Sequence, residues 1–313
     1  MGPYLLKRLL ATIPVMLVVA VFIFLLLRLT PGDPAAMIGG DYATEAQIDE
    51  IRQTLGLNEP LLTQFVIWIG NILQGDLGES FFFKKQVSEL IVARIEPTLS
   101  LSLVTIIFTV AIAVPIGVLA AYRHGSWIDR IVMGFSVLGF SVPVFVIGFG
   151  LIYVFSLQLS WFPVQGYNRI GNGVTPWIHN LILPALALSV IFVAFIARMT
   201  RTSVLEVLGE DYIRTARAKG QTETKVLMRH ALRNAAVPIV TVIGFAFAIL
   251  VGGVVVTESV FNIPGLGLLT VDAVLNRDFP TIQAVVLLFS LVYVMINLAI
   301  DLSYTLLDPR IRY

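Results

Sequence analysis

Six runs of mostly apolar residues, each long enough to cross a lipid bilayer as a helix, divide this chain of 313 residues. They cover residues 9–27, 98–122, 131–159, 181–199, 235–256 and 281–304. A hydrocarbon layer about 30 Å thick needs roughly 20 apolar residues, because each helical residue adds about 1.5 Å. Charged residues make up only 13% of the chain, whereas they are about a quarter of a typical soluble domain. We therefore predict an all-α, polytopic membrane protein with six transmembrane helices.

The first run has two possible interpretations. It follows Lys7 and Arg8, as the apolar part of a signal peptide would. It is, however, longer than the roughly 7 to 15 residues of such a part, and no cleavage site of the A-x-A type follows it. We interpret residues 9–27 as a retained transmembrane helix.

Basic residues are unevenly divided between the two sets of loops that six spans create. If both termini are inside, the loops on that side hold fourteen of the 21 Lys and Arg residues. The loops on the other side hold most of the acidic residues, including Asp33, Asp41 and Glu45. Since Lys and Arg near span ends concentrate on the cytoplasmic side, we predict that both termini are cytoplasmic.

Proline and glycine interrupt several of the spans. The third is the most affected, with Pro143 and four glycines. Transmembrane helices tolerate such residues because neighbouring helices and hydroxyl side chains satisfy the freed backbone groups. The interruptions are consistent with a moving pathway, and equally with the general abundance of proline and glycine in membrane helices.

The segment between the first two spans, residues 31–95, is far longer than a helix connection needs, and we expect it to be structured. Thr44 and Gln47 form a capping-box pattern before a short amphipathic helix, and Gly56 suits its C-terminal end. Residues 61–73 form a second, more apolar helix that lies at the membrane interface or packs on a span. Phe81, Phe82 and Phe83 precede two lysines, a pattern typical of anchoring at headgroup depth.

The segment 200–234, on the predicted inner side, is polar and basic, and its pattern is helical. Val204, Leu208 and Tyr212 recur on one stripe, which predicts a helix that continues to Gly220. Thr222 can then cap a second helix, whose apolar face carries Leu227, Met228, Ala231 and Leu232. We predict a helix-turn-helix that docks on an acidic partner surface. The alternative is a basic loop that only fixes the topology, and DNA binding is a poor alternative because both ends are tied to spans.

The sequence lacks the motifs that most membrane enzymes and ATPases use. It contains no phosphate-binding G-x-x-x-x-G-K-[ST] loop, no G-x-S-x-G and no cysteine. His124, His179 and His230 lie far apart, so we expect no metal site and no cofactor in this chain. Charged residues at membrane depth are few and lie near span ends, which disfavours a proton-driven carrier. If the chain is a transporter, we therefore expect a separate subunit to supply the energy for transport.

Several segments of the chain resemble the permeases of binding-protein-dependent ABC importers. The strongest is the run from Asp211 to Gly220, DYIRTARAKG, followed by RHALRN from Arg229 and by Pro238. Gln221 departs from the apolar residue that many relatives carry after the glycine. Nearly the whole chain is similar to the first of the two permeases of peptide (dipeptide, oligopeptide, glutathione) and nickel importers. The supporting segments are PGDPA from Pro31, LGL from Leu55, GDLG from Gly75, ESVF from Glu258, PGLG from Pro264, RDFP from Arg277 and DPR from Asp308.

The resemblance implies the fold, location and partners. The fold would be that of a type I, MetI-like permease in the cytoplasmic (inner) membrane of a prokaryote. The partners would be a paralogous permease, two cytoplasmic ATPase subunits that bind MgATP, and a periplasmic or lipid-anchored solute-binding protein, so that this chain is itself no enzyme. A secondary carrier without an ATPase is the alternative. The solute could be a dipeptide, oligopeptide, glutathione, nickel chelate or sugar.

The resemblance also implies four parts and their functional residues. The parts are an N-terminal helix (1–30), a periplasmic insertion (31–95), a transmembrane core (96–304) with its coupling loop (200–234), and a cytoplasmic tail (305–313). In this family a short coupling helix sits in a cleft of the ATPase, and the corresponding residues here are Asp211, Tyr212, Arg214, Thr215, Ala216, Arg217, Ala218, Lys219 and Gly220. The small residues would allow close approach and the cations would make polar contacts. Candidates for the translocation pathway are Ser136, Ser141, Pro143 and Asn297.

Overall fold

The computed structural model describes residues 2–29, 35–36, 44–54 and 56–307. In these residues the regular elements are helices, and one isolated bridge joins Glu79 and Gln86. The chain divides into two compact units. The larger unit contains Arg94–Leu268 and the chain from Val292 onward, and the smaller unit contains Gly2–Ala93 and Leu269–Leu291.

Five described helices are long and apolar enough to cross a membrane, and a strongly bent pair makes a possible sixth. The prediction of six spans is therefore confirmed if the bent pair counts as one. The five helices are α1 (Gly2–Leu29), α5 (Val87–Tyr122), α8 (Val174–Leu208), α12 (Ala236–Gly253) and α15 (Phe279–Leu307). Some of these helices extend well beyond the predicted apolar runs, because hydropathy marks the part that suits lipid rather than the helix ends.

The third predicted span is broken into α6 (Trp127–Ser141) and α7 (Val144–Leu151), and a π-helical turn continues α7 over Ile152–Gln158. The two halves are bent by 101°. The break falls at Val142, which is extended with φ −97° and ψ 121°, and at Pro143, which precedes the first turn of α7. A proline disfavours the helical conformation in the residue before it, so the sequence itself sets the position of this break.

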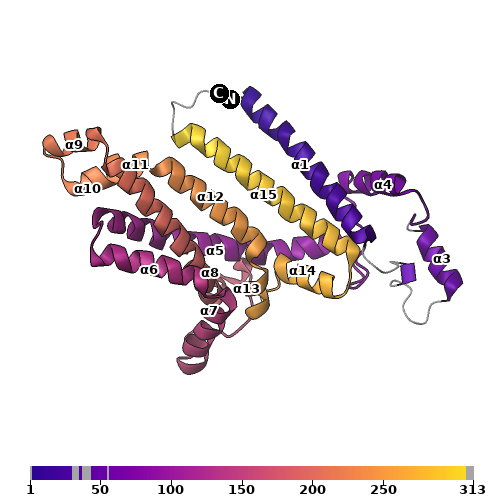
Figure 1. The fold of residues 1–313 in the computed structure, drawn as a ribbon. Coiled ribbons are helices and arrows are strands. Elements are labelled where there is room, and N and C mark those ends of the chain that lie inside the picture. The colour runs from indigo at the N-terminus through magenta and orange to yellow at the C-terminus, as the bar shows by residue number, and fades with distance from the viewer. Residues whose placement is uncertain (1, 30–34, 37–43, 55, 308–313) are drawn as a thin grey trace. The chain divides into compact units, whose positions relative to one another are not determined.

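Helix α8 forms the centre of the larger unit, where it lies against α6, α7 and α12 (Figure 1). Close packing at two glycines holds it there. A Cβ atom at Gly117 of α5 would lie 2.7 Å from the carbonyl oxygen of Ala197, and one at Gly139 of α6 would lie 2.9 Å from the Cβ of Ala194. Small residues let helix backbones approach closely where lipid provides no hydrophobic driving force.

The remaining short elements outside residues 200–234 are helical. They are α3 (Glu45–Thr54), α4 (Leu61–Leu73), the 3₁₀ turn Ile170–Asn172, α13 (Val255–Val260) and α14 (Leu266–Leu275). The capping box is confirmed, since the backbone N–H of Thr44 donates to Gln47 Oε1 at 2.9 Å. The left-handed residue after α3 is also confirmed, with φ +64° at Gly56. The predicted segments PGDPA and DPR lie mostly or wholly outside the described residues.

Candidate functional site

The polar segment 200–234 folds into a helical hairpin at one end of the larger unit (Figure 1). Its first arm is α9 (Asp211–Ala218), and its second arm runs through α10 (Glu223–Lys225), a π-helical turn (Val226–Ala231) and α11 (Leu232–Asn234). Helix α12 follows directly. We call residues 211–234 the hairpin. The predicted helix-turn-helix is therefore present.

The predicted continuous stripe from Val204 to Tyr212 is wrong. Helix α8 ends at Leu208, and Glu210 is extended with φ −72° and ψ 147° before α9 begins. The new helix has a different phase, so Tyr212 is exposed while Ile213 is fully buried. Ile213 is the only large aliphatic residue of α9, and that composition was the signal that could have identified it.

The turn of the hairpin is a Schellman motif at Gly220. This glycine has φ +76°. Its N–H donates to the carbonyl oxygen of Arg217 at 2.9 Å, and the N–H of Gln221 donates to that of Ala216 at 3.2 Å. These bonds satisfy the last carbonyls of α9 and reverse the chain, and the left-handed conformation they require favours glycine. The predicted role of Gly220 as a helix breaker is confirmed.

The two arms of the hairpin are held together by burial and by one ion pair. Ile213 and Ala216 are the buried residues of α9, which packs against the π-helical turn where Val226 is fully buried. The guanidinium of Arg217 donates to both carboxylate oxygens of Glu223, at 2.8 and 3.2 Å. The hairpin is therefore a preformed element rather than a flexible loop.

The predicted contact residues separate into two groups. Ala216 is buried inside the hairpin and Arg217 is engaged with Glu223, so both support the hairpin itself. Asp211, Tyr212, Arg214, Thr215, Ala218, Lys219 and Gly220 are exposed. Partial desolvation and the nearby Glu210 carboxylate raise the pKa of the Tyr212 phenol above its ordinary value. The exposed tip combines small residues at 218 and 220 with the cation Lys219. The cation of Arg214 is also exposed, and it donates to Oδ1 of Asp211 in the same helix at 3.3 Å.

Three of the four pathway candidates donate hydrogen bonds within their own helices, and the fourth lies at a helix break. The hydroxyls of Ser136 and Ser141 donate to the carbonyl oxygens of Val132 and Val137, at 2.9 and 3.0 Å. The amide of Asn297 donates to the carbonyl oxygen four residues earlier at 2.8 Å. Pro143 marks the break in the bent span. A role in the pathway stays a prediction for all four.

Sequence reasoning missed a buried carboxyl group in the larger unit, because Glu258 looked like a residue at a span end. The Glu258 side chain is fully buried. It accepts a hydrogen bond from the hydroxyl of Thr98 at 2.6 Å and another from the N–H of Leu268 at 2.9 Å. A Cβ atom at Gly265 would lie 2.2 Å from its carboxyl oxygen, and one at Gly267 would lie 2.9 Å away. The ESVF and PGLG segments therefore form one packed turn.

A second buried carboxylate organises the smaller unit. Asp278 accepts hydrogen bonds from the hydroxyl of Ser80, from the N–H of Phe81 at 2.9 Å and from the hydroxyl of Thr281 at 2.7 Å. The RDFP segment is thereby tied to the chain that follows GDLG. No cluster of three or more His, Asp or Glu suited to a metal ion occurs in the part of the chain that the structure describes.

Comparison with known proteins gives matches along the whole chain. Residues 113–313 match the family described as binding-protein-dependent transport system inner membrane component, and residues 1–102 match the N-terminal family of the same membrane components. The chain is 58% identical to a probable peptide ABC transporter permease protein, y4tP, of Sinorhizobium fredii, over all of both chains. It is 47% identical to the glutathione transport system permease protein GsiC of Salmonella typhi, over 99% of each.

A solved structure shares the fold. The MetNI methionine ABC transporter, in an inward-facing conformation, contains a chain that aligns with a TM-score of 0.59 and 22% identity. The alignment covers 71% of this chain and 97% of that chain. The match therefore supports a MetI-like permease fold.

Proposed function

Since this chain belongs to the family of binding-protein-dependent transport system inner membrane components, we propose that it forms a pathway for peptides together with a second permease. We further propose that the tip of its hairpin couples the passage of peptides to ATPase subunits. It is a permease subunit of an ABC importer, and a multi-pass inner membrane protein. The relatives favour this function over that of a secondary carrier. The observation that carries the coupling proposal is the preformed, exposed tip around Ala218 and Gly220.

The proposed substrate class is peptides, with glutathione included. It is supported by the names of the two relatives, which are a probable peptide permease and a glutathione permease. We assign the choice among individual peptides to the solute-binding protein, which delivers the substrate. The insertion, residues 31–95, would receive that protein on the periplasmic side.

The proposed docking mode follows from the geometry of the tip. The backbone at Ala218 and Gly220 carries little or no side chain, and a Cβ atom at Gly220 would meet nothing within 4 Å in this chain. A partner surface can therefore approach closely, while Arg214 and Lys219 reach acidic groups at the edge of the cleft. Asp211, Tyr212 and Thr215 would line the same contact, and Ala216 and Arg217 would hold its shape.

In the assembled importer, two ATPase subunits would bind and hydrolyse MgATP, and this chain would bind no cofactor. Nucleotide can drive the permease only through its different affinity for two arrangements of the ATPase pair. The hairpin would carry that difference to α8 and α12, between which it lies in the chain. This arrangement requires the hairpin and both termini to be cytoplasmic, as the distribution of basic residues favours.

The proposed division of the chain remains that of a first helix (1–30), a periplasmic insertion (31–95), a core (96–304) with its coupling loop (200–234) and a tail (305–313). Within the core, Ser136, Ser141 and Pro143 at the bent span and Asn297 in α15 are proposed to line the pathway. A helix broken at membrane depth is tolerated where it lines a cavity, which supports the assignment of the residues nearest the break.

Reconstitution tests the proposed function. The chain is placed in proteoliposomes with its second permease, ATPase subunits and binding protein, and uptake of a labelled dipeptide is measured with and without internal ATP. The proposal predicts uptake against a gradient only when ATP and all subunits are present. Uptake by this chain alone, driven by an ion gradient, would contradict it.

A further inference from the structure

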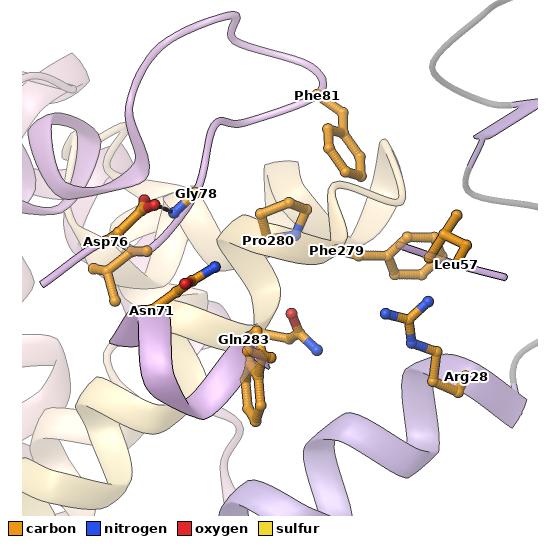
Figure 2. A pocket seen from close by; sticks show the side chains of 11 residues that line it. Arg28, Leu57, Asn71, Asp76, Gly78, Phe81, Phe279, Pro280 and Gln283 are labelled. Carbon is orange, nitrogen blue, oxygen red and sulfur yellow. Dashed lines mark hydrogen bonds between the residues drawn. The ribbon is translucent and has the colours of Figure 1, made fainter. Parts of the chain in front are cut away.

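A pocket of about 180 Å³ lies within the smaller unit, against the last turn of α1 (Figure 2). Arginine, amide and aromatic side chains share its walls. Those used below are Arg28, Leu57, Trp68, Asn71 and Asp76. None of the residues proposed for the peptide pathway or the hairpin lines this pocket, so its charged and aromatic walls point to a different ligand.

The cation in the wall has no anionic partner among the residues that the structure describes. Arg28 is half-buried, and its guanidinium carbon lies 5.2 Å from the ring centre of Phe24. Asp76 also lines the pocket, but its Oδ1 accepts the N–H of Gly78 at 2.9 Å. In Figure 2 the two charged side chains stand on opposite sides of the pocket. A half-buried guanidinium that only stacks on a ring retains donors for an anion.

The position of Arg28 along α1 places it at the depth of lipid headgroups. The apolar run of this helix covers residues 9–27, which is 19 residues. At about 1.5 Å per residue this run matches a hydrocarbon layer of about 30 Å. Arg28 follows the run directly, so its guanidinium lies at the edge of the hydrocarbon, where a long side chain reaches the headgroup layer. The phosphate groups of the bilayer lie in that layer.

Helix α4 supplies an independent indication of lipid beside the pocket. Leu62, Val66 and Leu73 are 75%, 61% and 81% exposed. On another side of the same helix, Phe65 and Trp68 contact the ring of Phe24, with centroid distances of 5.3 and 5.7 Å. A 13-residue helix is too short to span the bilayer. Its apolar face is suited to lying among acyl chains at the interface.

We propose that this pocket binds the phosphate group of a membrane phospholipid, in the leaflet at the C-terminal end of α1. The Arg28 guanidinium donates to the phosphate oxygens, because its planar set of N–H groups matches a phosphate in two-point contact. The acyl chains lie along the exposed face of α4. The bound lipid would thereby join α1 to α4 within the smaller unit.

A reporter thiol tests the proposal directly, since the natural chain contains no cysteine. The full-length Leu57→Cys variant is purified in a neutral detergent, and its labelling rate with a maleimide is measured as phosphatidylglycerol is added. The proposal predicts saturable protection. Adding Arg28→Gln should weaken the apparent affinity about tenfold, the usual effect of losing one charge-assisted contact. Adding Arg277→Gln, at an exposed arginine of the same unit, should leave the affinity unchanged.

Three further ligands separate the possible sources of protection. Diacylglycerol has acyl chains but no phosphate, inorganic phosphate has no chains, and a dipeptide offers a carboxylate. Protection by any of them at the phosphatidylglycerol concentration would overturn the proposal, as would equal affinity with and without Arg28→Gln. Native mass spectrometry provides a second readout. Wild type and Arg277→Gln should retain one phospholipid after detergent exchange, whereas Asn71→Phe, which narrows the pocket and keeps Arg28, should lose it.

Discussion

Arg201 of α8 and Asp129 in the first turn of α6 form a two-point ion pair that is largely shielded from solvent. The Nη2 of Arg201 donates to Oδ2 of Asp129 at 2.8 Å, and its Nε donates to Oδ1. The same carboxylate accepts the N–H of Gly125 at 3.0 Å. Farther along the two helices, Gly139 packs closely on Ala194. Because α6 and α8 are fixed at both places, we infer that movement of α8, which leads into the hairpin, also carries α6 to the break at Pro143.

Replacing Asp129 with asparagine should therefore destabilise the larger unit. The substitution leaves Arg201 shielded and without a countercharge, and the expected loss is about 3 kcal/mol of unfolding free energy. Thermal unfolding in detergent measures it. The matched control is Glu223→Gln at the exposed pair with Arg217, which should cost less than about 1 kcal/mol. Equal losses for the two variants would show that the Asp129 pair has no special structural role.

Alanine at Gly265 should disrupt the turn around Glu258. The new Cβ would lie 2.2 Å from the Glu258 carboxyl oxygen, and overpacking of a fixed core costs about 1–3 kcal/mol. We expect a lower midpoint of thermal unfolding and a lower yield of membrane-inserted protein. Gly252→Ala is the control, because a Cβ there meets nothing within 4 Å and alanine favours a helix. Unfolding of both variants at the wild-type temperature would contradict this prediction, because it would show that the turn accommodates a side chain at position 265.

Valine at Gly220 should reduce ATP-driven uptake more strongly than asparagine. The glycine has φ +76° and a Cβ atom there would meet nothing within 4 Å in this chain. Both side chains would enter the proposed docking surface, so the difference between the two variants comes from the backbone conformation. A left-handed conformation costs a β-branched residue about 1–2 kcal/mol or more, and asparagine tolerates it better. Uptake in proteoliposomes compares the two variants at equal levels of inserted protein. Equal uptake would remove the requirement for the Schellman turn.

Tryptophan at positions 216 and 218 should distinguish hairpin packing from docking. Ala216 is buried and Ala218 is exposed. Ala216→Trp should lower the thermal stability of the purified chain as well as transport. Ala218→Trp should leave the stability of the chain unchanged and abolish ATP-driven uptake, because it alters only the surface offered to a partner. Full transport by a correctly inserted Ala218→Trp variant would contradict the docking assignment.

The features that could be predicted from the sequence are those set by neighbours along the chain. The break at Pro143, the turn at Gly220 and the capping box at Thr44 all depend on residues within a few positions, and the structure has all three. The hydropathy of the spans depends only on composition within a window. The ends of these helices were missed because hydropathy detects only the apolar part of a helix. Charged residues continue the helices beyond the lipid and give no apolar signal.

The features that could not be predicted depend on residues far apart in the sequence. Glu258 is held by Thr98, 160 positions away, and Asp278 is held by Ser80, 198 positions away. Without the fold, each carboxylate is indistinguishable from a solvated residue at a span end. The phase of α9 relative to α8 was predicted wrongly for a different reason. A single extended residue, Glu210, shifts every later position on the helical stripe.

Cross-linking from the hairpin tip tests the central claim most directly. The chain has no natural cysteine, so an Ala218→Cys variant carries a single thiol, which a short bifunctional reagent can join to a lysine on a neighbouring subunit. In the assembled, transport-active complex, we predict that the cross-linked partner is the ATPase subunit and that MgATP changes the yield. A transport-active complex in which this thiol never reaches the ATPase subunit would contradict the account.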